Sequence, residues 1–148
     1  YNLGIALFTK QKIEEAISHY KMAIKLKPDY ADAHYNLGNA LFNRGKTEEA
    51  ISHYKIAVRL KPDYAQAHSH LGNALSVEQK TEEAISHYKT AIRLEPDYAA
   101  THYNLANNLL AMRKTQEAIS HYKMAIKLEP DYVQAHHNLK IALLQLKH

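Results

Sequence analysis

The chain has 148 residues, a formal net charge of +4, 46% hydrophobic residues and 23% charged residues, a composition typical of a globular domain. The absence of cysteine excludes disulfides, thiolate metal sites and cysteine nucleophiles, and no apolar run approaches the ~18 residues that a membrane span needs. No secretory leader is visible, and the chain begins at Tyr1 inside a helical pattern, so we expect a cytoplasmic fragment of a longer protein.

The four prolines of the chain lie 34 residues apart and define an internal repeat. They are Pro28, Pro62, Pro96 and Pro130, and each is followed by Asp-Tyr and then Ala or Val. Counted from the residue after each Pro-Asp-Tyr, the full units are 31–64, 65–98 and 99–132. Residues 1–30 form a unit without its first four positions, and residues 133–148 form the first half of a fifth. Positions are numbered 1 to 34 within a unit, with residue 31 at position 1.

Each unit is predicted to form a helix, a turn and a second helix. In the unit 31–64, apolar residues at 3.6-residue spacing indicate the face of the first helix that is buried. Gly45 ends that helix, and Pro62 ends the second. We expect Asp63 to cap the next helix with Gln66 as its capping-box partner, Asp29 and Asp32 to do the same one unit earlier, and Thr47 to cap the second helix.

The pattern of large and small residues recurs in register in every full unit. It has Leu at positions 7 and 11, Gly or Ala at 8, Ala at 20 and 27, Tyr at 24 and Pro at 32. It resembles the tetratricopeptide repeat (TPR) family over the whole chain. The resemblance implies an all-α, right-handed superhelical solenoid of antiparallel helix pairs, a single array over residues 1–148 with about four and a half repeats. His at position 4, usually a large aromatic residue in this family, and Lys140 at position 8 depart from the pattern.

Lys140 bears on the end of the array. A lysine does not fit where a second helix must press close, so we expect residues 133–148 to form a terminal capping helix that covers the fourth unit. The alternative is that the array is simply cut at this point.

One stripe of the first helix carries most of the difference between units. The units 31–64 and 65–98 differ at ten positions, and five of them (2, 5, 6, 12 and 13) lie on that stripe. Two explanations of these differences are open. The exposed positions drifted after the repeat was duplicated, or the stripe was selected to bind a partner. The TPR resemblance implies that positions 2, 5, 6, 9, 12 and 13 face a concave groove where ligands lie. The candidate groove residues are Asn2, Tyr35, Asn36, Asn39, Phe42, His70, Asn73, Tyr103, Asn104, Asn107, His137 and Asn138.

Asparagine recurs at positions 6 and 9, although it is a poor helix former. Its side chain offers a donor and an acceptor that match the N–H and C=O of a peptide backbone. The rows therefore predict a groove that holds an extended peptide, and they resemble the asparagine row in the TPR region of O-linked N-acetylglucosamine transferases. The alternative is that these amides bond one another, or loop carbonyls, between neighbouring first helices.

Other partners and activities are not indicated. Chaperone-binding members of the family hold a C-terminal carboxylate with basic residues at positions 2, 5 and 6, and here none of these positions is Lys or Arg. The basic residues lie in turns and on second helices among acidic ones, without the continuous stripe that nucleic acid requires. The eleven His show no His-x-x-x-His pair and are interpreted as packed or solvated rather than metal-bound, so no cofactor is expected. No catalytic constellation is present, and we expect no enzymatic activity.

Three functions remain open. The leading interpretation is a scaffold that binds a protein or an extended peptide. The second is the substrate-recruiting arm of a larger enzyme, such as an O-linked glycosyltransferase, and the third is a homo-oligomer formed through the groove or the ends of the array.

Overall fold

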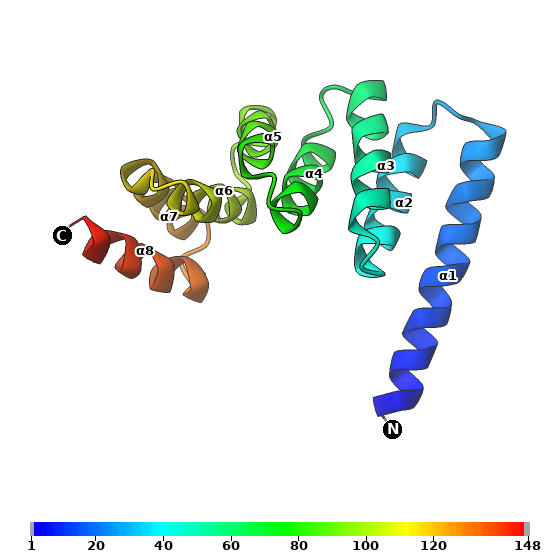
Figure 1. Cartoon of the computed structure of the whole chain (residues 1–148), viewed down its shortest axis with the longest axis horizontal. Helices are drawn as coiled ribbons and strands as arrows, with labels where there is room; N and C mark the ends of the chain where they lie inside the picture. Colours follow the sequence, from blue (N-terminus) through cyan, green and yellow to red (C-terminus); the bar gives the residue numbers. More distant parts are fainter. Residues whose placement is uncertain (1, 147–148) are drawn as a thin grey trace.

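A computed structural model describes the backbone of residues 2–146 and the side chains of residues 11–146. Within residues 2–146 the chain forms eight α-helices and no strand, stacked in chain order with the two ends of the array far apart (Figure 1). The helices are α1 (Asn2–Leu26), α2 (Ala31–Asn43), α3 (Thr47–Leu60), α4 (Ala65–Val77), α5 (Thr81–Leu94), α6 (Ala99–Ala111), α7 (Thr115–Leu128) and α8 (Val133–Gln145). The expected all-α solenoid is confirmed. No helix in the described part of the chain is long and apolar enough to cross a membrane.

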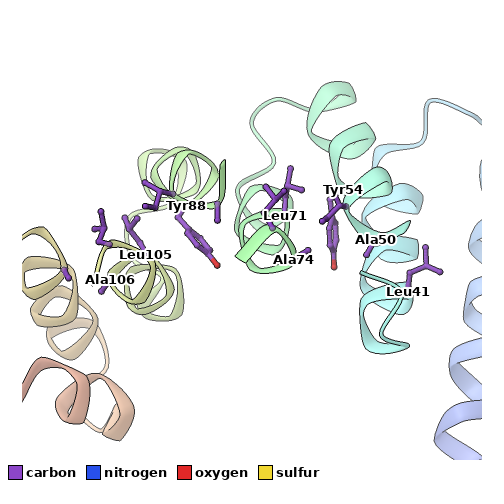
Figure 2. Close-up of a cluster of buried hydrophobic side chains, with 14 of the residues drawn as sticks. Leu41, Ala50, Tyr54, Leu71, Ala74, Tyr88, Leu105 and Ala106 are labelled. Carbon is purple, nitrogen blue, oxygen red and sulfur yellow. The ribbon is translucent and has the colours of Figure 1, made fainter. Parts of the chain in front are cut away.

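The three full units fold as helix hairpins, namely α2–α3, α4–α5 and α6–α7. The leucines at positions 7 and 11 and the tyrosine at position 24 are buried in all three, and together with small residues they form one continuous core (Figure 2). Position 8 must be small because a Cβ added to Gly38 would lie 2.6 Å from the Tyr54 ring. The packing therefore explains why Gly or Ala alternates with large residues in the repeat.

The turn between the two helices of a hairpin has the same backbone conformation in all three units. Gly45 has a positive φ of 74°, and Gln79 and Arg113, at the same position, have φ of 59°. In each turn two backbone N–H groups bond back to the end of the first helix, as from Lys46 to Leu41 and from Gly45 to Phe42, both at 2.9 Å. This is a Schellman motif, which satisfies carbonyls that the helix end leaves free.

The expected side-chain caps are wrong. Thr47 is the first residue of α3, the cap position is Lys46, and no side chain caps this helix. The cap position of α4 is Tyr64, so Asp63 lies one residue too early, and the Gln66 amide bonds the Glu95 carboxylate instead at 3.0 Å. Asp29 and Asp32 likewise flank Tyr30, which occupies the cap position of α2. The rings of Tyr64 and Tyr132 pack on Tyr35 and Tyr103, whereas Tyr30 and Tyr98 are exposed.

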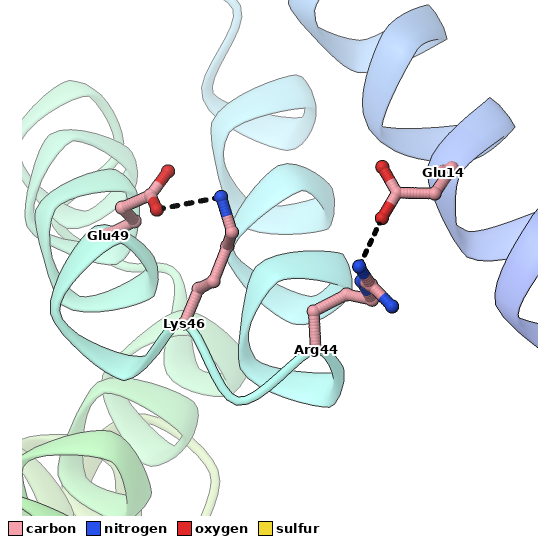
Figure 3. Close-up of polar contacts among 4 residues, drawn as sticks. All are labelled: Glu14, Arg44, Lys46 and Glu49. Carbon is pink, nitrogen blue, oxygen red and sulfur yellow. Dashed lines mark ion pairs between the residues drawn. The ribbon is translucent and has the colours of Figure 1, made fainter.

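The first unit differs from the others because α1 is one helix of 25 residues rather than a helix, a turn and a helix (Figure 1). Ile13 stands where Thr47, Thr81 and Thr115 begin the second helices of the other units. Isoleucine continues a helix where threonine favours its start, so the pattern provides no break. Arg44 at the end of α2 forms an ion pair with Glu14 of α1 at 2.6 Å, which links the two packed helices (Figure 3).

Residues 133–145 form α8, which packs on α7. Its buried residues are Ala135 and Ala142, and Lys140 is exposed on the face that a second helix would cover. At position 11 of α8, Leu143 is 40% exposed, whereas Leu75 at the same position of α4 is fully buried. Whether α8 is a native cap stays a prediction.

Candidate functional site

A chain of hollows runs along the first helices and defines the candidate site, called here the first-helix groove. The first hollow, of about 340 Å³, is lined by Asn39, Phe42, Asn43, Tyr54, His70 and Asn73. The second, of about 320 Å³, shares Phe42 and Asn73 with it and adds Ser76, Val77, Tyr88, Asn104, Asn107 and Asn108. A third, of about 340 Å³, continues from Asn107 to Tyr122, Asn138 and α8. No charged side chain lines these three hollows.

The asparagine at position 9 bonds the tyrosine at position 24 within each repeat. The hydroxyls of Tyr54, Tyr88 and Tyr122 donate to Oδ1 of Asn39, Asn73 and Asn107 at 2.7, 2.8 and 2.7 Å. Because each tyrosine ring is buried in the core, the amide at position 9 is held by a rigid donor.

The side chain at position 6 bonds the same Oδ1 atom from the next repeat. Asn104 Nδ2 donates to Asn73 Oδ1, and Asn138 Nδ2 donates to Asn107 Oδ1, both at 2.9 Å. Between α2 and α4 the donor is His70, whose Nδ1 lies 2.7 Å from Asn39 Oδ1. The asparagines therefore bond one another between neighbouring first helices, as the alternative interpretation expects.

These internal bonds leave a fixed set of groups for a ligand. Each Oδ1 at position 9 accepts two bonds, so the Nδ2 amine of the same side chain remains as a donor. At position 6, Asn104 and Asn138 use Nδ2 internally and keep Oδ1 as an acceptor. Each step along the groove thus leaves one donor and one acceptor without an internal partner.

His70 preserves this polarity although it replaces asparagine. Because Nδ1–H donates to Asn39, Nε2 carries the free lone pair and takes the place of the asparagine oxygen. Burial lowers the pKa of His70, which favours the neutral ring at pH 7. The ring also lies 5.4 Å from Tyr35 and edge-on to Tyr54, so it is held in place from three sides.

The remaining predicted residues fall into distinct groups. Tyr35 and Tyr103 pack on Tyr64 and Tyr132 of the following corner, with ring centroids 4.9 Å apart. Asn36 is half-buried and has no hydrogen-bond partner among the described residues, in keeping with Ile at position 9 of the unit before it. His137 is exposed on α8. The side chain of Asn2 lies outside the described residues.

Sequence reasoning missed the groove role of the buried tyrosines and of Asn108, whereas Asn43 and Ser76 lie at positions 13 and 12 of the stripe that the TPR resemblance assigns to the groove. The joint recurrence of Tyr at position 24 and Asn at position 9 in the full units is the signal that could have found the first group. Ser76 matters because the same position is Phe42 in the preceding repeat and Leu110 in the following one, so a small side chain opens the middle of the groove.

Comparisons with known proteins place these repeats in context. A family model described as TPR repeat matches residues 4–43, 38–76 and 78–112, and a tetratricopeptide repeat model matches residues 99–132. No curated protein sequence matches. A crystal structure of MamA is 27% identical, with a TM-score of 0.89, and the match covers 94% of this chain and 81% of MamA.

Two further structures match at lower identity. MamA from Desulfovibrio magneticus RS-1 is 19% identical, with a TM-score of 0.86, over 99% of this chain and 82% of that chain. The first TPR of Spaghetti (RPAP3), solved with the HSP90 peptide SRMEEVD bound, is 24% identical, with a TM-score of 0.78, over 80% of this chain and 94% of that chain. At these sequence identities the structural similarity shows the fold alone.

Proposed function

Because the chain belongs to the tetratricopeptide repeat family, we propose that it is a non-catalytic scaffold that binds an extended peptide or partner segment in the first-helix groove. The observation that carries the proposal is the donor and acceptor presented at each step of the groove. An extended backbone carries alternating N–H and C=O groups, so a row of such pairs can hold it with little regard to side chains.

The absence of charge in the groove limits the kind of partner that can bind there. The hollows carry amides, hydroxyls and aromatic rings but no Lys, Arg, Asp or Glu, which favours an uncharged segment over nucleic acid or an anionic membrane surface. The acidic peptide SRMEEVD seen with RPAP3 is a poor match for this chain, whose positions 2, 5 and 6 carry neither Lys nor Arg.

The free energy of peptide binding expected from the groove is modest. A neutral hydrogen bond contributes ~1 kcal/mol net, and ordering a flexible peptide opposes binding. Four or five such bonds with aromatic packing support an affinity on the order of micromolar or weaker.

The same amide row supports a second candidate, the substrate-recruiting arm of a larger enzyme such as an O-linked glycosyltransferase. In that case the groove would bind unrelated extended substrates equally well, and a catalytic domain would be encoded elsewhere in the same gene. The full-length gene therefore distinguishes the arm of an enzyme from a free-standing scaffold.

The test measures peptide binding to the groove directly. A library of uncharged 15-residue peptides is screened on the whole chain, and hits are titrated by fluorescence anisotropy. Ser76→Phe fills the middle of the groove and is expected to weaken binding at least tenfold. Ser52→Phe, on the exposed side of α3, is the matched control and should leave binding unchanged.

The asparagine variants separate backbone recognition from stability. Asn36→Ala removes an amide that has no described partner, so it should weaken binding without lowering the melting temperature. The double variant with Asn104→Ala should weaken binding further. Equal affinity of the wild type, Ser76→Phe and the double variant for every hit would contradict binding in the groove.

A further inference from the structure

A pair of histidines joins the two helices of every full repeat. The Nδ1 atoms of His34 and His53 lie 3.0 Å apart, and the same distance separates His68 from His87 and His102 from His121. The ring centroids are 5.3 Å apart in all three pairs, which is close to the largest separation that this Nδ1–Nδ1 distance allows. The two imidazoles therefore meet head-on through their Nδ1 atoms.

The backbone fixes which nitrogen carries the proton. Nε2 of the position-4 histidines lies 3.0, 3.0 and 2.9 Å from the carbonyl oxygens of Pro28, Pro62 and Pro96. A carbonyl only accepts, so Nε2–H donates and Nδ1 of the same ring carries a lone pair. The position-23 histidine must then donate its Nδ1–H to that lone pair. Each pair thus links the second helix, the first helix and the loop that precedes it.

The two members of a pair differ in their access to solvent. His34, His68 and His102 are 5–8% exposed, whereas His53, His87 and His121, called here the outer rings, are half-buried. A first added proton can reach Nε2 of the outer ring without breaking a bond. A second can bind only at the inner Nδ1, where it faces the donated Nδ1–H, so the doubly charged pair must separate.

The surrounding charges act in the same way in each repeat. His53 faces His34 on α2, Lys21 on α1 and Glu49 on its own helix, and burial, followed by His34 and Lys21, lowers its pKa. For His121 the corresponding groups are His102, Lys89 and Glu117, with the pKa lowered for the same reasons.

In the central repeat, burial, then His68 and Lys55, lower the pKa of His87 to about 4, opposed by Glu83. His68 faces Arg93 on α5, and burial lowers its pKa despite the bond to Pro62.

A metal ion does not fit the pairs. A chelated ion would need the two lone pairs to converge on a third point, whereas here the rings point at each other. Among the described residues no group of three metal-ligating side chains occurs. The ligand that fits between these nitrogens is a proton.

We propose that the three histidine pairs act as acid-labile clasps. While both rings are neutral, a pair holds the first helix of its repeat to the second helix and to the preceding loop. When both rings are protonated, the pair separates and releases the first helix. Because the three clasps lie in adjacent, stacked repeats, acidification loosens the array as a whole. The pKa of His53, His87 and His121 is lowered in the folded chain, so their contribution to stability is complete above the unfolded pKa of about 6.5 and is lost as the pH falls toward the folded value.

The test compares urea unfolding at pH 7.5 and pH 5, at both of which carboxylates of ordinary pKa are mostly ionised. The wild type is expected to lose stability at pH 5, with the His87 pair alone lowering the folding equilibrium constant by about tenfold after allowance for solvent screening. The triple variant His53→Asn, His87→Asn, His121→Asn keeps a donor at the place of Nδ1 but cannot titrate. It should match the wild type at pH 7.5 and lose the part of the pH dependence that His53, His87 and His121 contribute, whereas His68 and His70, whose pKa burial also lowers, keep their part.

The controls distinguish the effect of the histidine pairs on stability from the effect of other histidines. His19→Asn changes the exposed position-23 histidine of α1, which pairs with no histidine among the described residues, and should leave the pH dependence intact. Histidine 1H–15N spectra of the wild type at pH 7.5 should show the Nε2–H tautomer at His34, His68 and His102. A pH-independent wild type, a triple variant with the full wild-type dependence, or the opposite tautomer would each overturn the proposal.

Discussion

The tyrosine hydroxyls at position 24 stay protonated at any pH near neutrality. Burial raises the pKa of Tyr122 to about 12 and shifts Tyr54 and Tyr88 in the same direction. A hydroxyl that stays protonated always donates, so the oxygen of the neighbouring amide accepts from it and the NH2 group of that amide is left for the groove. A core residue thereby sets the hydrogen-bonding character of the surface.

Tyr88→Phe removes one such donor and leaves the packing intact. We expect a loss of about 1 kcal/mol in the free energy of unfolding, because a part-buried hydrogen bond to Asn73 is lost. The measurement is urea unfolding at pH 7.5. Tyr20→Phe is the matched control, since the corresponding position 9 of its unit is Ile5, and it should change stability by less than half as much. Equal losses in both variants would show that the hydroxyl bond contributes nothing.

At the scale of single elements, the hairpin turns show how far the repeat tolerates variation. Gln79 and Arg113 adopt the left-handed conformation that Gly45 adopts freely, at a cost of ~1–2 kcal/mol for a residue with a Cβ. The turn persists because two backbone hydrogen bonds and the packing of both helices hold it.

Gln79→Gly and Arg113→Gly are expected to stabilise the array by about 0.5–1 kcal/mol each, since relief of the strain exceeds the entropic cost of glycine. Gly45→Ala should destabilise it by a similar amount. Thermal and urea unfolding of the three single variants check this. A gain in stability for Gly45→Ala would mean that the left-handed position carries no strain.

The elements themselves were largely predictable, and the exceptions have physical causes. Helix bounds followed from Pro62 and Gly45 and from the spacing of apolar residues, which depend on local chemistry. The expected side-chain caps were wrong because each first helix begins one residue after the tyrosine, which leaves the preceding aspartate outside the cap position. The turn position alone does not predict the unbroken α1, because Gln11 matches Gln79, which does turn. The difference lies at Ile13, which replaces the threonine that begins the other second helices.

The whole molecule is held together by neighbours in sequence. Among the described residues every pair of helices in contact is adjacent in the chain or separated by a single helix. Stability is then close to a sum of repeats and interfaces, so a helix with one interface is less protected than a helix with two. The central helix α4 contacts α3 and α5, whereas α8 contacts α7 and, slightly, α6.

Native-state hydrogen exchange should reveal this gradient. The amide of Leu143 in α8 is expected to exchange much faster than that of Leu75 in α4, which occupies the same position of its repeat but is fully buried. Leu41 and Leu109 serve as internal references and should resemble Leu75. Uniform protection along the array would instead indicate a single cooperative unit.

The site was only half predictable at this scale. Seven of the candidate residues line the groove, and the TPR pattern together with internal comparison located them; they are Asn39, Phe42, His70, Asn73, Asn104, Asn107 and Asn138. Their hydrogen-bond roles were not predictable, because an amide at position 9 can bond a ligand, a neighbour or a buried hydroxyl equally well. The partner that the amide bonds depends on the tyrosine at position 24, such as Tyr54, which reaches the groove from the second helix of the hairpin.

The amide network also constrains how such an array can evolve by duplication. An asparagine at position 9 has its full set of bonds only when the next unit supplies a donor at position 6, so every full unit depends on the identity of its successor. The first and last units carry Ile5 and Ile141 at position 9, where no such dependence exists. Internal units can therefore be copied in place, while a shuffled order that puts an end unit in the middle breaks the row.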